Sequence, residues 1–130
     1  MKSIKPLLMA FICTLALAGC GSRTARIVNV DTPLAVHYSA DHVKQAILQA
    51  GMARQWVMTP VQPGVINGSL KARDHQANIQ ITYSPDSYSI HYVSSKNLLA
   101  DTKGNIHRNY NHWIANLNKD IQIRLINTAN

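Results

Sequence analysis

The feature that most constrains the fold is the alternation of apolar and polar residues between Trp56 and Val93. A two-residue period places successive side chains on opposite faces of a β-strand. The clearest example runs from Ala77 to Tyr83, where Ala, Ile, Ile and Tyr alternate with Asn, Gln and Thr. Turn residues interrupt the pattern at Pro63-Gly64, Asp74-His75-Gln76 and Ser84-Pro85-Asp86. These segments predict a four-stranded antiparallel meander with one apolar and one polar face.

Helical patterns flank the strands on both sides. Ser39 is suited to the N-cap position, Asp41 lies in the first turn, and Gly51 is expected to end this first helix. The last helix has one apolar stripe over four turns, formed by Tyr110, Trp113, Ile114, Leu117, Ile121 and Leu125. The sequence therefore predicts the α+β class, a two-layer domain in which an N-terminal and a C-terminal helix cover one face of the meander.

The N-terminal segment predicts how the chain is exported. Lys2 and Lys5 precede an apolar run from Leu7 to Leu17, which is shorter than the ~20 residues of a spanning helix. The run ends in Leu17-Ala18-Gly19-Cys20, which resembles a bacterial lipobox. The resemblance implies that residues 1–19 are a lipoprotein signal peptide and that Cys20 is the lipidated first residue of the mature chain. The alternative is a plain secreted protein in which a cysteine follows the cleavage site by chance.

The lipobox also suggests a location and a domain organisation. Gly21 follows Cys20 in place of the aspartate associated with inner-membrane retention, so the resemblance favours the outer membrane, with the domain facing the periplasm. Residues 20–36 are expected to be the lipidated cysteine and a tether. Within this tether, Arg26 to Val30 is a candidate edge strand that Asp31-Thr32-Pro33 would end. Residues 37–130 are expected to form a single periplasmic α+β domain.

The charge and the cysteine content of the chain limit the classes of partner that we expect. The chain has 13 Lys and Arg against 6 acidic residues, all of them Asp; Lys2 and Lys5 leave with the signal, so the mature part carries a charge of about +5. A basic cytosolic protein would suggest nucleic acid, but export excludes that partner. In the envelope, a positive charge favours anionic lipid, lipopolysaccharide or an acidic protein surface. Cys13 leaves with the signal and Cys20 is assigned to lipid, so no thiol remains for a disulfide or a nucleophile.

The sequence contains no recognisable catalytic or metal-binding motif. No spacing typical of zinc ligands joins the 6 histidines, and the nucleophile elbow Gly-x-Ser-x-Gly is absent. We therefore expect no catalytic residues, no metal, no cofactor and no enzyme activity. Two alternatives stay open: a metal site assembled from distant strands, such as His75 with His91, and a hydrolase whose pocket joins His75, His91 or His107 to a carboxylate.

The outward face of the predicted sheet is the candidate interaction surface. Its side chains are polar, neutral to basic and without an acid, and Lys71, Arg73, Gln80 and His91 are the residues we select from it. The alternative is a face that simply contacts water. The aromatic residues of the last helix and of the strand around Ile90 are expected to pack in the core.

Four further segments resemble a family of small proteobacterial envelope lipoproteins. They are Pro63-Gly64-Val65-Ile66-Asn67-Gly68, Arg73-Asp74-His75-Gln76-Ala77, Tyr88-Ser89-Ile90-His91-Tyr92 and the run from Ile106 to Ile114. The resemblance extends from about Val43 to Leu125 and implies the envelope location but no particular activity. We expect a non-enzymatic binding or envelope-assembly role for an outer-membrane lipoprotein. The alternatives are a module that binds a small ligand or lipid between helices and sheet, and an envelope hydrolase.

Overall fold

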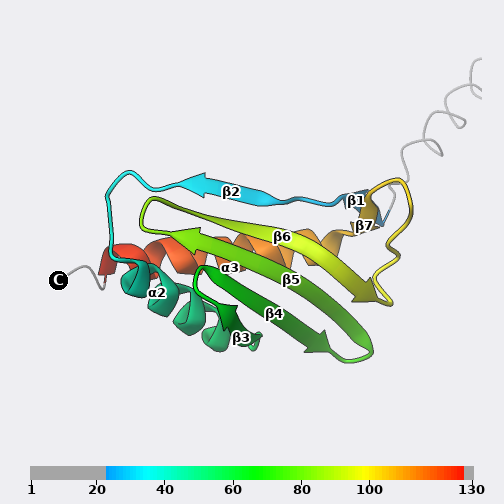
Figure 1. Cartoon of the computed structure of the whole chain (residues 1–130). Helices are drawn as coiled ribbons and strands as arrows, with labels where there is room; N and C mark the ends of the chain where they lie inside the picture. Colours follow the sequence, from blue (N-terminus) through cyan, green and yellow to red (C-terminus); the bar gives the residue numbers. More distant parts are fainter. Residues whose placement is uncertain (1–22, 128–130) are drawn as a thin grey trace, which may run out of the picture.

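A computed structural model describes residues 23–127, so the signal peptide and Cys20 lie outside the described residues. Its larger layer is a five-stranded antiparallel sheet in the order β2-β6-β5-β4-β3 (Figure 1). The strands are β2 (Val30–Pro33), β3 (Val57–Gln62), β4 (Val65–Ala72), β5 (His75–Ser84) and β6 (Ser87–Lys96). The consecutive strands β3 to β6 form the predicted meander. The prediction of four strands was incomplete, because β2 joins the sheet beside β6.

Two helices form the second layer, α2 (Ala40–Ala53) and α3 (Arg108–Asn127). They cover the same face of the sheet and leave the other face open (Figure 1). A separate two-stranded ladder pairs β1 (Thr24–Arg26) with β7 (Asn105–His107) at the end of the molecule where α3 begins. The α+β class and the placement of both helices on one face agree with the sequence prediction.

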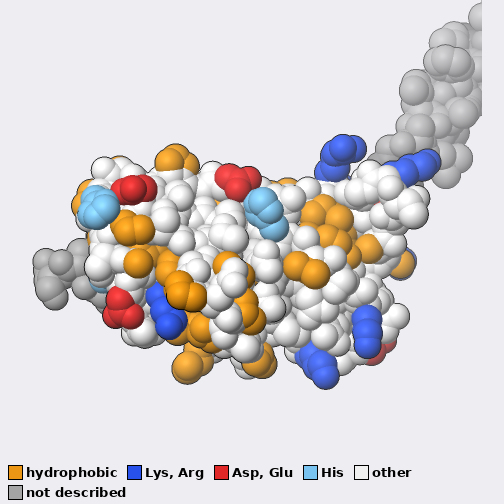
Figure 2. Space-filling model, viewed as in Figure 1, with side chains coloured by type: hydrophobic (Ala, Val, Ile, Leu, Met, Phe, Trp, Pro, Cys, Tyr) orange, Lys and Arg blue, Asp and Glu red, His pale blue; other side chains and the backbone are white. Residues whose placement is uncertain are grey.

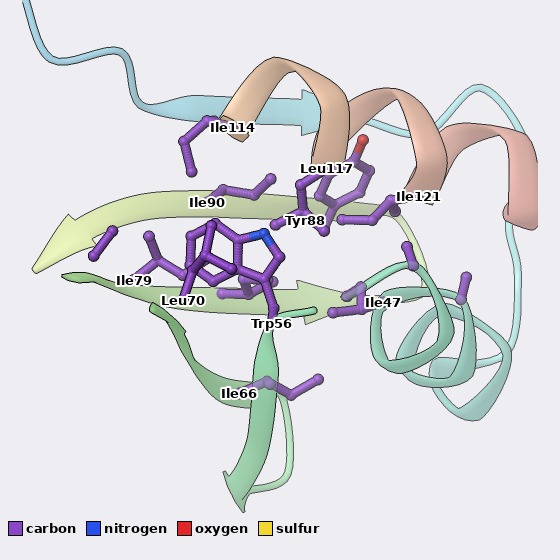
Figure 3. Packing of buried hydrophobic residues seen from close by; sticks show 14 of the residues in the cluster. Ile47, Trp56, Ile66, Leu70, Ile79, Tyr88, Ile90, Ile114, Leu117 and Ile121 are labelled. Atoms are coloured by element: carbon purple, nitrogen blue, oxygen red, sulfur yellow. The ribbon is translucent and has the colours of Figure 1, made fainter. Parts of the chain in front are cut away.

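The core lies between the helices and the sheet (Figure 3). The apolar stripe of α3 is buried as predicted, except that Trp113 is only half-buried. The inward side chains of β4, β5 and β6 are also buried, and they include Ile66, Ile79, Ile81 and Ile90. Leu98 and Ile106, which belong to neither the alternating nor the helical apolar pattern, complete the core.

The first helix begins where predicted but ends later. The Ser39 hydroxyl accepts a hydrogen bond from the His42 amide at 3.0 Å, as expected for an N-cap. Gly51, however, is buried inside α2 and does not end it. Its carbonyl accepts hydrogen bonds from the amides of Arg54 and Trp56, so the reversal occurs at Arg54 and Gln55. A side chain at Gly51 would collide with Met58, which indicates that this glycine permits close packing of α2 on β3.

The segment expected to be a tether contains two strands in its described part. The predicted edge strand over residues 26–30 was wrong in position, because β1 ends at Arg26 and β2 begins at Val30. Asp31 to Pro33, expected to end a strand, lie within β2. Between the strands, the Ile27 amide donates to the Gly104 carbonyl and the Asn29 side chain accepts from the Tyr92 amide. The chain therefore leaves one ladder and joins the other. Pro33 is tolerated because β2 is an edge strand.

Candidate functional site

The uncovered face of the five-stranded sheet is the candidate site, and we call it the open face. Its side chains are mainly amides and hydroxyls, because the strands alternate apolar residues toward the helices with polar residues outward. Figure 2 views this face, which is largely white with scattered apolar patches. Inward neighbours such as Ile79 and Ile81 are buried, so the polar residues between them cannot turn into the core.

One row of side chains crosses four strands at the centre of the open face. Asn67 on β4, Gln80 on β5 and His91 on β6 are register partners. The Gln80 amide nitrogen donates to the Asn67 side-chain oxygen at 3.4 Å. On β2, the Asp31 carboxylate lies 2.9 Å from Nε2 of His91. The expectation that this face is free of acid was therefore wrong, since β2 was not predicted to belong to the sheet.

A second row lies beside the first. The Asn78 amide nitrogen donates to the Ser94 hydroxyl at 2.9 Å. The Gln76 amide nitrogen lies 3.2 Å from the Asn78 side-chain oxygen and 3.4 Å from the Ser69 hydroxyl. These neutral groups bond to one another and still present spare donors and acceptors outward, because each side-chain amide has two of each. Such a surface suits a polar, uncharged contact more than an ionic one.

A hollow of about 380 Å³ is lined by residues of both rows. Gly68 and Ile79 are among the residues that line it, and so are two exposed valines, Val57 at 67% exposure and Val93 at 58%. Val93 is the extra residue of a β-bulge, because Asn78 pairs with Ser94 whereas Ile79 pairs with Tyr92. Bulges redirect side chains, and this one places Val93 and Ser94 at the same hollow. The open face thus combines polar rows with an apolar rim.

The structure divides the four predicted interaction residues between two places. Gln80 and His91 are register partners in the central row of the open face. Lys71 lies near the end of β4, paired with Gln76, and Arg73 lies in the β4–β5 turn with a positive φ of 59°. Sequence reasoning missed Asp31 as a member of this face, and it did not select Val57 and Val93 as interaction residues. The isolated valines carried a signal, since each takes an outward position in the alternating pattern.

The histidines named in the two chemical alternatives are dispersed. His91 contacts Asp31, whereas Nδ1 of His75 lies 2.7 Å from the Asn97 carbonyl at the end of the sheet. His107 accepts a hydrogen bond from the Asn109 amide and so caps the start of α3. Within residues 23–127, no group of three or more His, Cys, Asp or Glu side chains could hold a metal ion. Two of these histidines each lie beside one carboxylate, His91 at 2.9 Å from Asp31 and His75 at 3.6 Å from Asp74, and both pairs are exposed.

A second hollow of about 380 Å³ lies at the far end of α3. The connection from β2 to α2 and the last turns of α3 line it, with Leu34, Val36 and Ile126 among the apolar contributors. The predicted cleft between helices and sheet is occupied by core side chains such as Ile47 and Leu117 (Figure 3). A small apolar ligand would therefore be accommodated at the end of the helix layer.

Groups with perturbed pKa values lie in the helix layer, in the core and in the loop over residues 97–104. In that loop, hydrogen bonds from Asn105 lower the pKa of Asp101. The Arg54 guanidinium donates to the Asp120 carboxylate at 2.7 Å, and this contact joins the end of α2 to α3. The hydrogen bond lowers the pKa of the Asp120 carboxyl. Burial raises the pKa of the Tyr88 and Tyr110 phenols. None of these groups lines the central hollow.

Neither helix between residues 23 and 127 has the length and hydropathy needed to cross a bilayer. No protein-family model matches the chain, and a comparison with curated proteins finds no similar sequence.

Proposed function

We propose that this chain is a lipoprotein anchored in the outer membrane through Cys20, whose periplasmic domain binds another envelope component through the open face. The role is non-enzymatic, in binding or envelope assembly. The lipobox supports the anchor, and the uncovered sheet face supports the binding role. The observation that carries the proposal is the asymmetry of the sheet: one face is sealed by two helices, and the other presents polar rows around a hollow.

The composition of the open face favours a protein partner or another polar polymer. Amide and hydroxyl groups of Asn67, Gln80 and Asn78 provide directional hydrogen bonds, and Val57 and Val93 provide apolar contact at the rim. A polar surface with a small apolar component is typical of non-obligate interfaces. The single acidic group, Asp31, is already engaged with His91, so the partner need not be strongly charged.

Site-specific photocrosslinking in intact cells tests this role. A photoreactive amino acid replaces Gln80 on the open face, and the matched control replaces Gln45, an exposed glutamine of α2. We expect irradiation to trap a discrete adduct from position 80 and none from position 45. The substitution Asn78→Arg, which places a long charged side chain beside the hollow, is expected to abolish the adduct while the protein accumulates normally.

Two outcomes would contradict the binding role. The absence of any adduct from position 80, with normal accumulation of the protein, would remove the evidence for a partner at the open face. Equal adducts from positions 80 and 45 would indicate random collision with abundant envelope proteins.

The second hollow supports an alternative ligand, a small apolar molecule or lipid chain. Its lining is mostly apolar and includes the exposed residues Val36 and Ile126. A native mass spectrum of the purified protein is expected to retain a ligand if this function is correct. Replacement of Val36 by Asp should then release the ligand, and a ligand-free spectrum of the wild-type protein would count against the alternative.

A further inference from the structure

The domain's positive charge is concentrated at one end. The end built from β1, β7, the loop over residues 97–104 and the β4–β5 turn carries Arg23, Arg26, Lys71, Arg73, Lys96, Lys103 and Arg108, with only Asp74 and Asp101 as acids. The rest of the described chain has four basic and four acidic residues, so its formal charge is zero. The whole charge of +5 therefore resides at what we call the basic end.

The parts of the basic end are joined by hydrogen bonds. Nδ1 of His75 lies 2.7 Å from the Asn97 carbonyl, the His107 amide donates to the Leu98 carbonyl at 2.7 Å, and the Arg108 amide donates to the Arg23 carbonyl at 3.1 Å. Figure 2 shows blue Lys and Arg side chains around this end, on the side of the molecule where the described chain begins. Among the described residues, none of the seven basic side chains forms a salt bridge. Their charges stay available to an anionic surface.

An exposed leucine lies within this end. The 97–104 loop turns Leu98 into the core and leaves Leu99 55% exposed, with a positive φ of 57° that a leucine rarely adopts. The Asp101 carboxylate fixes the loop by accepting hydrogen bonds from the amides of Lys103 and Asn105, both at 2.9 Å. An exposed leucine on a loop fixed by hydrogen bonds, with Lys96 and Lys103 on either side of it in the sequence, has the composition of an interfacial membrane contact.

The position of the proposed anchor agrees with this contact. Only four residue steps separate Cys20 from Thr24, the first residue of β1, and this length spans at most about 14 Å. Because β1 pairs with β7 at the basic end, a lipid on Cys20 would hold this end against the bilayer surface. The opposite end lies roughly 30 Å away, the length of α3.

We infer that the basic end docks on the anionic phospholipid headgroups of the membrane that carries the anchor, with Leu99 at the level of the acyl chains. The inference rests on the proposed anchor at Cys20. In this orientation α3 rises away from the membrane, and the open face is turned sideways, where a periplasmic partner can reach it. The basic residues hold the orientation by electrostatic attraction, and the lipid supplies most of the attachment.

A spin-label measurement on the purified full chain tests this orientation. Leu99→Cys carries a nitroxide, and Ser87→Cys is the matched control because Ser87 is exposed at the end of β6 opposite to Lys96. Each chain is reconstituted in vesicles of phosphatidylcholine alone and of phosphatidylcholine with phosphatidylglycerol. We expect the label at position 99, in the anionic vesicles only, to gain contact with oxygen and lose contact with a water-soluble nickel complex. The label at position 87 should stay in water in both.

Charge variants supply the second control. Lys96→Gln with Lys103→Gln removes two lysines from the basic end, and Lys44→Gln with Lys119→Gln removes two from elsewhere. Each lysine near an anionic surface is expected to change the docked-to-undocked ratio by about fivefold, so the first pair should reduce this ratio by about 25-fold and the second by little. Equal effects of the two pairs, or a label at position 99 that remains water-exposed on vesicle-bound protein, would overturn the inference.

The same preparation separates failure of the docking from failure of the anchor. Intact mass spectrometry reports whether Cys20 carries acyl chains, independently of the spin label. An unacylated protein would contradict the anchor. The label at position 99 would then be measured on the unacylated chain mixed with the anionic vesicles. Docking of the basic end still predicts that this label contacts the membrane, and that high salt removes the contact.

Discussion

At the scale of single residues, the core contains one polar atom without a partner. Tyr110 is fully buried, and its hydroxyl has no hydrogen-bond partner among the described residues. Its ring meets the Tyr92 ring edge to face, with centroids 5.4 Å apart. The ring therefore stabilises the core through packing, while the buried hydroxyl opposes folding because it loses its bonds to water.

Tyr110→Phe should therefore stabilise the protein. We expect the free energy of unfolding to rise by about 1 kcal/mol, because the substitution keeps the ring and removes an unpaired hydroxyl. The matched control is Tyr88→Phe, which removes a hydroxyl that donates to the Asn118 side chain, and which should cost about 1 kcal/mol. Urea unfolding followed by circular dichroism measures both. A loss of stability for Tyr110→Phe as large as that for Tyr88→Phe would indicate a partner for the Tyr110 hydroxyl.

Sequence reasoning was effective for residues whose environment follows from periodicity. Ile79, Ile81, Ile90 and the stripe of α3 are buried as the two-residue and helical patterns predict. It missed Leu98 and Ile106, because their burial depends on the path of a loop between two ladders and not on a local period. The outward positions of Val57 and Val93 followed from the pattern, but the bulge that places Val93 and Ser94 at the same hollow did not.

At the scale of elements, the close approach of α2 to the sheet depends on two glycines and one methionine. A Cβ atom at Gly51 would lie 2.4 Å from Cε of Met58, and one at Gly68 would lie 3.1 Å from its sulfur. Met58 thus fills the space between α2 and β4. The sequence suggested a helix-ending role for Gly51, because a glycine late in a helical pattern usually has that role. Its packing role became evident only from the tertiary contact.

Gly51→Val should destabilise the protein, because its side chain overlaps with Met58. We expect a loss of about 1–3 kcal/mol in the free energy of unfolding. Met58→Ala introduced with Gly51→Val should recover part of that loss, since it vacates the contested space. Ala53→Val, at an exposed position in the same helix, is the control and should have a small effect. Simple additivity of the Gly51→Val and Met58→Ala losses would contradict this account of the contact.

The order of strands in the sheet was predictable where short turns join neighbouring strands. It was not predictable where the paired strands are distant in the sequence. The meander β3 to β6 follows from alternation and turn residues. The addition of β2 beside β6 required a pairing across more than fifty residues, for which a four-residue segment containing Pro33 gives little local signal. The missing strand had a functional consequence, because β2 brings Asp31 to His91 on the open face.

At the scale of the whole molecule, the domain has an open face and a basic end, and these are different surfaces. Gln80 and His91 belong to the first, while Lys71 and Arg73 belong to the second. The sequence identified all four as outward but placed them on one surface, because the spread of basic residues along the chain conceals their convergence in space. The proposals assign the open face to a partner and the basic end to the membrane.

The proposed lipid at Cys20 places both surfaces in the envelope, so intact mass spectrometry of the protein extracted from the envelope is the most direct test. We predict a mature chain that begins at Cys20 and carries the mass of a diacylglycerol and an N-linked acyl chain. Labelled palmitate should enter the wild-type protein and not Cys20→Ala. A mature N-terminus at another residue, or an unmodified Cys20, would contradict the account.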